Sequence, residues 1–181
     1  MRIIAGEWRG RKLTAPEGEL TRPTADRTRE TLFSMLTSRL GSFEGLRIAD
    51  LFAGSGALGL EALSRGAASC LFVEQDPAAI RALRRNISGL HAQDRCDVRA
   101  TSVLSLGAAR GEQLDLLLLD PPYETGAGVV AIDKLTRLGW VAPSAWVSLE
   151  TSRAENVSLK GFTVDTVRDV GKARLHLMRP E

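Results

Sequence analysis

The segment Asp50-Leu51-Phe52-Ala53-Gly54-Ser55-Gly56-Ala57-Leu58-Gly59 decides the expected fold of this chain of 181 residues. Gly54, Gly56 and Gly59 follow the GxGxxG spacing of a loop that connects a strand to a helix. Glu74 lies twenty residues after Gly54, where an acid that binds a ribose is expected. The pattern predicts a nucleotide-binding unit. Taken alone, it also allows a simple tight turn or the dinucleotide site of a nicotinamide oxidoreductase.

The sequence around this loop alternates between two kinds of segment. Alternating or fully apolar runs predict strands, and apolar residues at three-to-four spacing predict helices. We expect strands at 47–52, 69–74, 97–101, 114–119 and 145–149, and helices at 24–40, 57–65, 77–90 and 127–138. Thr24 is expected to cap the first helix. Residues 162–168 and 173–178 both alternate in polarity, and no helix is expected between them, which predicts a β-hairpin. The predicted fold is α/β, with a mostly parallel sheet and an antiparallel hairpin at one edge.

The composition fits one cytoplasmic domain. Hydrophobic residues make up 44% and charged residues 25% of the chain, so a core can form. No apolar run approaches the ~18 residues of a membrane helix, and the first residues lack the apolar stretch of a signal peptide. Cys70 and Cys96 have no CxxC spacing and there is no histidine cluster, so we expect neither a disulfide framework nor a metal site. We expect a monomer.

The formal net charge of +2 hides an uneven distribution. Residues 1–40 carry eight Lys or Arg and five Asp or Glu, residues 41–150 carry ten and thirteen, and residues 151–181 carry six and four. Residues 3–23, rich in Gly and Pro, are expected to form short strands or loops. The basic N-terminal segment indicates a polyanionic partner, and the acidic central segment indicates a cationic ligand. On charge alone, an ordinary solvated surface explains the same numbers.

Three acids are expected at the carboxyl ends of neighbouring strands, namely Asp50, Glu74 and Asp120. Ligands of open parallel sheets bind beyond these ends. Carboxylates gathered there would repel a diphosphate by roughly 1–4 kcal/mol per close pair. They would attract an ammonium or a sulfonium group. S-adenosylmethionine carries both, together with a ribose diol for Glu74, so charge favours a methyl donor over a dinucleotide.

The tetrapeptide Asp120-Pro121-Pro122-Tyr123 follows the most apolar run of the chain. An exocyclic amine of a nucleobase is a weak nucleophile, because its lone pair is delocalised into the ring. Asp120 and a backbone carbonyl of the proline pair, most simply that of Pro121, can hold its two N–H groups and aim the nitrogen at a methyl group. Tyr123 offers a face for base stacking, worth ~1–3 kcal/mol per base. The structural alternative is a rigid exit turn with a partly buried Tyr123.

Together these motifs resemble the class I methyltransferases that modify exocyclic amines. Further matching blocks are Glu61-Ala62-Leu63-Ser64-Arg65-Gly66-Ala67, Gly10-Arg11-Lys12-Leu13, Arg22-Pro23-Thr24 and Arg29-Glu30-Thr31-Leu32-Phe33. From Arg2 to about Glu150 the chain resembles the bacterial RsmD family. The family implies methylation of the N2 amine of a guanine in 16S ribosomal RNA, and a Rossmann-like sheet of seven strands with a short N-terminal extension.

Carried onto matching positions, the resemblance implies a role for each motif. The donor, S-adenosylmethionine, which leaves as S-adenosylhomocysteine, would be bound by Asp50, Phe52, Gly54, Gly56, Glu74, Thr101 and Ser102. The guanine would be held by Asp120, Pro121, Pro122 and Tyr123. Residues 1–41 would form a basic extension that contacts RNA through Arg9, Arg11, Lys12, Arg22 and Arg29, with Trp8 as a stacking face or as part of the core. Residues 42–181 would form the methyltransferase core.

One position departs from the wider class. Many relatives place an Asp after the fourth strand to bind the adenine amine, whereas this chain has Ala100-Thr101-Ser102 there. Thr101 or Ser102 would have to replace that Asp, through a side chain or a backbone N–H.

Two other functions stay open from the sequence. A DNA adenine-N6 methyltransferase uses a similar acid-or-amide-Pro-Pro-aromatic turn, but it normally needs a target-recognition segment that this chain is too short to supply. A non-catalytic RNA-binding factor of ribosome assembly would keep only the fold. Because the excess positive charge is modest, we expect the substrate to be 16S ribosomal RNA in a partly or fully assembled small subunit rather than naked RNA.

Overall fold

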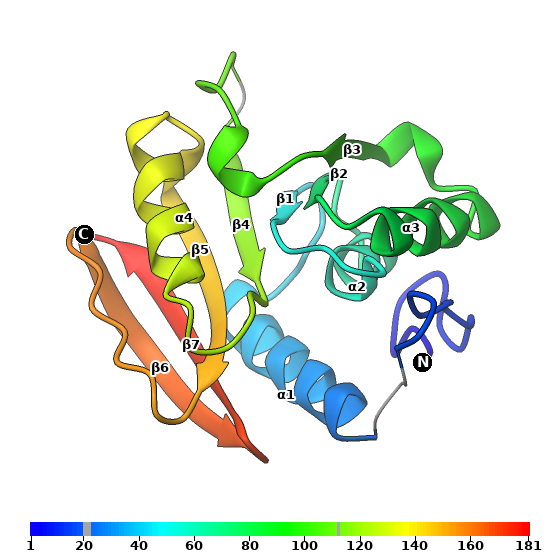
Figure 1. Ribbon diagram of the computed structural model, residues 1–181, viewed down its shortest axis with the longest axis horizontal. Helices are drawn as coiled ribbons and strands as arrows, with labels where there is room; N and C mark the ends of the chain where they lie inside the picture. Colours follow the sequence, from blue (N-terminus) through cyan, green and yellow to red (C-terminus); the bar gives the residue numbers. More distant parts are fainter. Residues whose placement is uncertain (20–22, 112) are drawn as a thin grey trace.

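The computed structural model describes residues 1–19, 23–111 and 113–181. Within these residues, seven strands form one sheet in the order β3-β2-β1-β4-β5-β7-β6 (Figure 1). The strands are β1 (Arg47–Asp50), β2 (Ser69–Glu74), β3 (Cys96–Ala100), β4 (Leu114–Leu119), β5 (Val141–Ser152), β6 (Phe162–Val170) and β7 (Ala173–Pro180). Strands β1 to β5 are parallel, and β7 is antiparallel to both β5 and β6. The predicted parallel sheet with a closing hairpin is confirmed.

Helices alternate with these strands, as predicted. They are α1 (Pro23–Leu40), α2 (Ala57–Ser64), α3 (Pro77–Gly89) and α4 (Ala127–Arg137), with short 3-10 helices η1 (Gln93–Arg95) and η2 (Val103–Ser105). Helix α3 starts as its sequence requires, since the Asp76 side chain accepts a hydrogen bond from the Ala79 N–H at 3.0 Å. The expected cap at Thr24 is wrong, because α1 already begins at Pro23. Proline suits a first turn, where the missing N–H would have no helical partner.

The central strand β4 separates two layers of the core. Leu116 and Leu118 pack in the cluster that contains residues of α1, α2 and α3, whereas Leu117 and Leu119 pack in the cluster that contains residues of α4. Figure 1 shows α4 apart from the other three helices. Because both faces of β4 are covered, its sequence is a continuous apolar run.

The N-terminal loop (residues 1–19) is part of the first layer. Ile3, Trp8 and Leu13 join the same core cluster as the side chains of α1 and α2. Turns and one antiparallel bridge between Arg2 and Lys12 shape the loop, which agrees with the predicted short strands or loops. Trp8 is only 9% exposed, with the Arg95 guanidinium 5.3 Å from its ring centroid. The interpretation of Trp8 as an exposed stacking face is therefore wrong.

A buried acid fastens this loop to α2. The Glu61 carboxylate, which is 0% exposed, accepts hydrogen bonds from the Ile4 N–H at 2.9 Å and the Ala5 N–H at 3.1 Å. It also accepts one from the Arg65 side chain at 2.9 Å. Ser64, one turn later, accepts a hydrogen bond from the Trp8 N–H at 3.0 Å. The start of the chain is therefore held against the helix that follows the glycine loop.

The order of the strands creates a crevice at one edge of the sheet. The chain leaves β1 toward α2 on one face, and it leaves the neighbouring β4 toward α4 on the other. Such a switch point is where open α/β sheets bind ligands. In the part of the chain that the structure describes, no helix combines the length and apolar character needed to span a bilayer.

Candidate active site

A cavity of about 1140 Å³ lies at this switch point. The loops that follow β1, β2, β3 and β4 line it, together with the first half of α1 and the turn between β6 and β7. Small-molecule pockets usually measure ~300–1000 Å³. The cavity is therefore large enough for a nucleoside-sized ligand and a nucleobase together.

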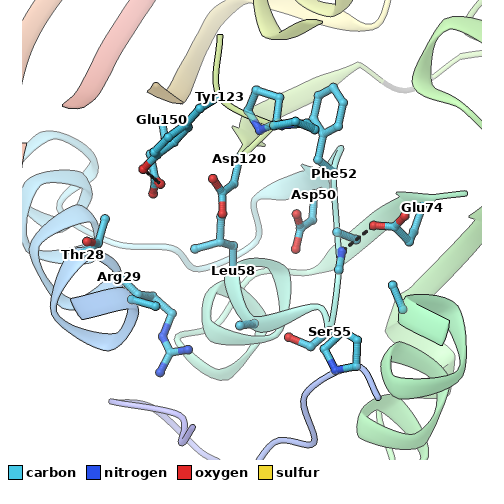
Figure 2. Close-up of a pocket in the computed structure, with 18 of the residues that line it drawn as sticks. Thr28, Arg29, Asp50, Phe52, Ser55, Leu58, Glu74, Asp120, Tyr123 and Glu150 are labelled. Atoms are coloured by element: carbon cyan, nitrogen blue, oxygen red, sulfur yellow. Dashed lines mark hydrogen bonds between the residues drawn. The ribbon is translucent and has the colours of Figure 1, made fainter. Parts of the chain in front are cut away.

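Four carboxyl groups follow one another across the cavity, in the order Glu74, Asp50, Asp120 and Glu150 (Figure 2). Each interacts electrostatically with its neighbour in this row. Among the described residues, seven acidic and two basic side chains line the cavity: Glu19, Asp26, Asp50, Glu74, Asp76, Asp120 and Glu150 against Arg29 and Lys172. The structure thus brings together the three acids expected at the strand ends. No described group of His, Cys, Asp or Glu has an arrangement that could hold a metal ion.

Asp50 is the most buried member of the row. It is 1% exposed, and its Oδ2 accepts a hydrogen bond from the Gly59 N–H at 2.9 Å. Burial raises the pKa of Asp50 to about 7, with a smaller contribution from the charge of Glu74, while the Gly59 hydrogen bond opposes the rise. Near neutral pH this carboxyl group is poised between its two states, so a nearby cation would ionise it.

The three glycines of the loop have different structural roles. Gly54 has φ +55° and lines the cavity, and a Cβ there would meet no atom within 4 Å. A Cβ on Gly56, which has φ +86°, would lie 2.4 Å from Leu83 Cδ1, and one on Gly59 would lie 2.4 Å from Phe72 Cε1. Packing therefore requires Gly56 and Gly59. Gly56 is not among the described residues that line the cavity, so a donor contact there is not supported.

Glu74 braces the glycine loop from the end of β2. Its Oε1 accepts a hydrogen bond from the Gly54 N–H at 2.8 Å. Its Oε2 accepts hydrogen bonds from the Gln75 and Asp76 N–H groups, both at 2.9 Å. Each carboxylate oxygen offers two lone pairs. One lone pair, on Oε1, remains for a ligand hydroxyl while the loop keeps this arrangement.

Asp120 lies directly after β4 and is exposed to the cavity. Protein atoms surround its carboxyl group on the other sides. This burial raises its pKa well above the usual range, and the charge and hydrogen bond of Glu150 and the charge of Asp50 raise it further. Pro121 is buried and Pro122 is exposed, and both line the cavity.

Tyr123 is tied to the last acid of the row. Its hydroxyl donates a hydrogen bond to Glu150 Oε2 at 2.7 Å, which fixes the ring at the cavity edge (Figure 2). The side chain is 41% exposed, so it keeps a free surface. Burial and the contact with Glu150 raise the pKa of Tyr123, so the hydroxyl stays protonated. The sequence analysis did not predict Glu150 as a site residue. Its expected position, just after a parallel strand and thus near the other three acids, could have indicated one.

The loop after β3 completes the cavity. Ser102 lines it, and its Oγ accepts a hydrogen bond from the Leu104 N–H at 3.2 Å. Thr101 is not among the described lining residues, whereas Phe52 is. Leu104, 44% exposed, also lines the cavity and was missed from the sequence, since an apolar loop residue resembles a core residue.

The predicted RNA-contacting cations occupy different environments. Arg9, Arg11 and Lys12 are exposed on the N-terminal loop, and Arg22 lies outside the described residues. Arg29 is 6% exposed and lines the cavity from α1. It donates to the Arg2 carbonyl and lies 3.6 Å from Asp26 and 3.9 Å from Glu61. Acids and a carbonyl hold Arg29 inside, so it lies apart from the exposed cations, and its contact with RNA stays a prediction.

Comparisons with known proteins point to one group of enzymes. A family model described as "Conserved hypothetical protein 95" matches residues 1–179. The ribosomal RNA small subunit methyltransferase D of Escherichia coli is 42% identical over 156 residues, which cover 86% of this chain and 76% of that protein. The solved Escherichia coli protein yhhF has a TM-score of 0.87 and 36% identity, covering 100% of this chain and 98% of that one.

A more distant structure shares the fold alone. Magnesium protoporphyrin IX methyltransferase from Synechocystis, solved with bound S-adenosylmethionine, has a TM-score of 0.65 at 13% identity, covering 91% of this chain and 87% of that one. The predicted class I methyltransferase architecture is confirmed.

Proposed function

The chain belongs to the RsmD family, and from this premise we propose that it transfers a methyl group from S-adenosylmethionine to the N2 amine of a guanine in 16S ribosomal RNA. One observation carries the proposal: the four carboxyl groups, which follow one another from the glycine loop to Asp120-Pro121-Pro122-Tyr123. Such a row suits a cationic donor at one end and an amine at the other. The named rRNA methyltransferases among the relatives support the substrate class.

The described residues fit this donor. The open space beside Gly54 allows a ligand to approach the backbone, and Asp50 offers a negative charge to an ammonium or sulfonium group. Glu74 keeps one lone pair for a ribose hydroxyl. Phe52, Ser102 and Leu104 form the walls around the adenine base of the donor. When bound, S-adenosylmethionine supplies a methyl group that is already activated by its positive sulfur.

The acceptor half of the site holds the guanine amine. In its ionised form, which a bound cationic donor favours despite the raised pKa of the free group, the Asp120 carboxylate accepts one N–H, and the Pro121 carbonyl accepts the other. These two contacts reduce the conjugation of the amine lone pair with the ring. That lone pair forms the new N–C bond while the electron pair of the C–S bond stays on sulfur. The methylated nitrogen then loses one proton, for which the Asp120 carboxylate is an acceptor. Catalysis by these residues is mainly positioning, and Tyr123 stacks on a base that has left its helix.

A transfer assay tests the proposal. Purified protein is incubated with radiolabelled donor and with protein-free 16S RNA, assembled small subunits or double-stranded DNA. We expect label on guanine N2 in RNA, located by mass mapping, with assembled or partly assembled subunits preferred. Label confined to DNA adenine would establish the alternative methyltransferase. Methylation absent from every substrate, with RNA binding retained, would favour a non-catalytic assembly factor.

Donor affinity is expected to depend on pH through Asp50. The pKa of this group is raised to about 7 in the free protein, and a bound cation lowers it, so binding releases a proton below that pH. Affinity should therefore fall up to about tenfold per pH unit below pH 7 and level off above it. Calorimetry in buffers of different ionisation enthalpy measures the released proton. In Asp50→Asn, donor binding should be weaker and largely independent of pH, and a wild-type affinity that is constant from pH 5 to 8 would contradict the assignment.

Tyr123 is expected to act through its ring rather than its hydroxyl. Tyr123→Phe keeps the stacking face and loses only the contact with Glu150. Its kcat/KM should fall by less than about fivefold, the value of one hydrogen bond. Tyr123→Ala should lose about 5- to 150-fold, the equivalent of ~1–3 kcal/mol of stacking. Steady-state methylation of RNA compares the two variants, and equal losses would show that the hydroxyl is the important group.

A further inference from the structure

Helix α3 exposes three arginines and contains no acidic residue. Arg81, Arg84 and Arg85 are exposed, and their spacing of three and four residues places them on one face of the helix. Among the described residues, none of the three takes part in an ion pair or a side-chain hydrogen bond. Other arginines are neutralised by carboxylates at 2.6 or 2.7 Å, in the pairs Arg39–Asp165, Arg95–Glu7, Arg137–Asp133 and Arg174–Asp169.

The exposed cations of the N-terminal loop lie at the far end of the same helix. Arg11 Nη2 donates a hydrogen bond to the carbonyl of Gly89, the last residue of α3, at 2.8 Å. Arg9, Arg11 and Lys12 are all exposed and have no carboxylate partner in the described part of the chain. Glu7, the nearest acid in this stretch, is already paired with Arg95. Arg11 thus brings the exposed cations of the N-terminal loop to the end of the helix that carries the other three.

A buried amide connects the two segments that carry these cations. Asn86, on the inner face of α3, is 5% exposed. Its Oδ1 accepts a hydrogen bond from the Thr14 N–H at 2.7 Å, and its Nδ2 donates to the Thr14 carbonyl at 2.9 Å. The same Nδ2 donates to the carbonyl of Ser55 in the glycine loop at 2.9 Å. One side chain therefore connects the N-terminal loop, α3 and the loop that borders the cavity.

The helix leads directly away from the cavity. Asp76 and Ala79, at its start, line the cavity, and Gly89 at its end touches Arg11. With a rise of ~1.5 Å per residue, the segment from Ala79 to Gly89 is about 15 Å long. Its apolar side chains Leu83 and Ile87 are buried in the core and Ile80 is half-buried, so the exposed face is mainly polar and offers little apolar surface to a membrane. A row of unpaired guanidinium groups on a polar face fits the phosphates of a nucleic acid strand.

We propose that Arg81, Arg84 and Arg85 join Arg9, Arg11 and Lys12 in a single phosphate-binding surface, which holds the RNA backbone beside the cavity. This inference rests on the proposed function, which makes the partner an RNA. Asn86 fixes the position of this surface relative to the glycine loop. The surface therefore positions the RNA relative to the donor as well as binding it. The acidic cavity repels phosphates, and the basic surface next to it attracts them. The RNA backbone therefore stays outside the cavity, and only the target base, turned out of its helix, enters it.

The test compares two variants with the same change in charge. Arg81→Gln/Arg84→Gln/Arg85→Gln removes the cations of α3. The control, Arg110→Gln/Arg137→Gln/Lys160→Gln, removes three exposed cations that precede β4, β5 and β6. They lie toward the amino ends of these strands, whereas the cavity lies at the carboxyl ends of the parallel strands. Binding to transcribed, protein-free 16S RNA is measured by filter retention over a range of salt concentrations, with donor binding and thermal unfolding as checks on folding.

We expect the α3 variant to bind RNA at least about tenfold more weakly and its salt slope to fall by about 2, since each lost phosphate contact removes ~0.7–0.9. The control variant should retain most of its affinity and slope. Equal binding by the two variants, while the wild-type protein methylates guanine, would overturn the surface and leave the proposed function intact. Loss of RNA affinity confined to the α3 variant, in a wild-type protein that does not methylate guanine, would support the surface and overturn the proposed function.

Discussion

Asp120→Ala is expected to lower kcat/KM for RNA methylation by about 10²- to 10⁴-fold, the range found when a positioned proton acceptor or hydrogen-bonding group is removed from an active site. The carboxylate that holds the amine and accepts its proton is lost, and a water molecule in its place has no fixed orientation. Donor affinity should change by less than about fivefold, because one screened charge pair is worth ~1 kcal/mol. Steady-state methylation and calorimetry with S-adenosylmethionine measure the two effects separately.

Two further variants sharpen this result. Asp120→Asn keeps one acceptor oxygen at nearly the same place, so its loss of kcat/KM should be smaller than that of Asp120→Ala. Asp133→Ala removes an exposed carboxylate from α4, whose partner is Arg137, and should leave methylation unchanged. Full activity in Asp120→Ala would exclude this residue from the transfer step. A parallel loss of donor binding would instead place its main role at the donor.

The central strands were the most predictable part of the fold. The bounds of β2 and β4 agree with the expected ones, since buried parallel strands are read directly from apolar runs. Strand β5 is much longer than expected, Val141–Ser152 rather than 145–149. It pairs with β4 along one side and with β7 along the other, so its ends are fixed by long-range pairing that local sequence patterns do not contain.

The site was predictable where chemistry follows from position along a strand. Asp50 and Glu74 each end a strand of the parallel sheet and Asp120 directly follows one, and topology alone brings such ends together. The environments of Trp8 and Arg29 were not predictable, because an exposed cation and a buried one have the same sequence signal. Arg29 is buried by Glu61, thirty-two residues further along, and only the fold places them together.

Glu61→Ala is expected to lower the free energy of unfolding by about 3–5 kcal/mol, the usual cost of breaking a buried ion pair. The carboxylate is fully buried and satisfies two backbone N–H groups, of Ile4 and Ala5, as well as Arg65. Alanine would remove the acceptor of both N–H groups and the carboxylate partner of Arg65, and Arg29 would lose the charge that lies 3.9 Å away. The melting temperature should fall by roughly 6–20 °C, at ~2–4 °C per kcal/mol for a domain of this size.

The matched control is Glu30→Ala on α1, an exposed carboxylate, which should change stability by less than about 0.5 kcal/mol. Glu61→Gln separates charge from shape, because the amide keeps the size of the side chain but turns one acceptor into a donor that faces backbone N–H groups. Its stability should therefore be much nearer to that of Glu61→Ala than to the wild type. Hydrogen exchange at Ile4 and Ala5 should accelerate before the sheet unfolds, because this carboxylate holds the N-terminal loop on α2. If the loop stayed protected in Glu61→Ala, its apolar contacts through Ile3, Trp8 and Leu13 would be sufficient to hold it, and the carboxylate would serve only to neutralise Arg29 and Arg65.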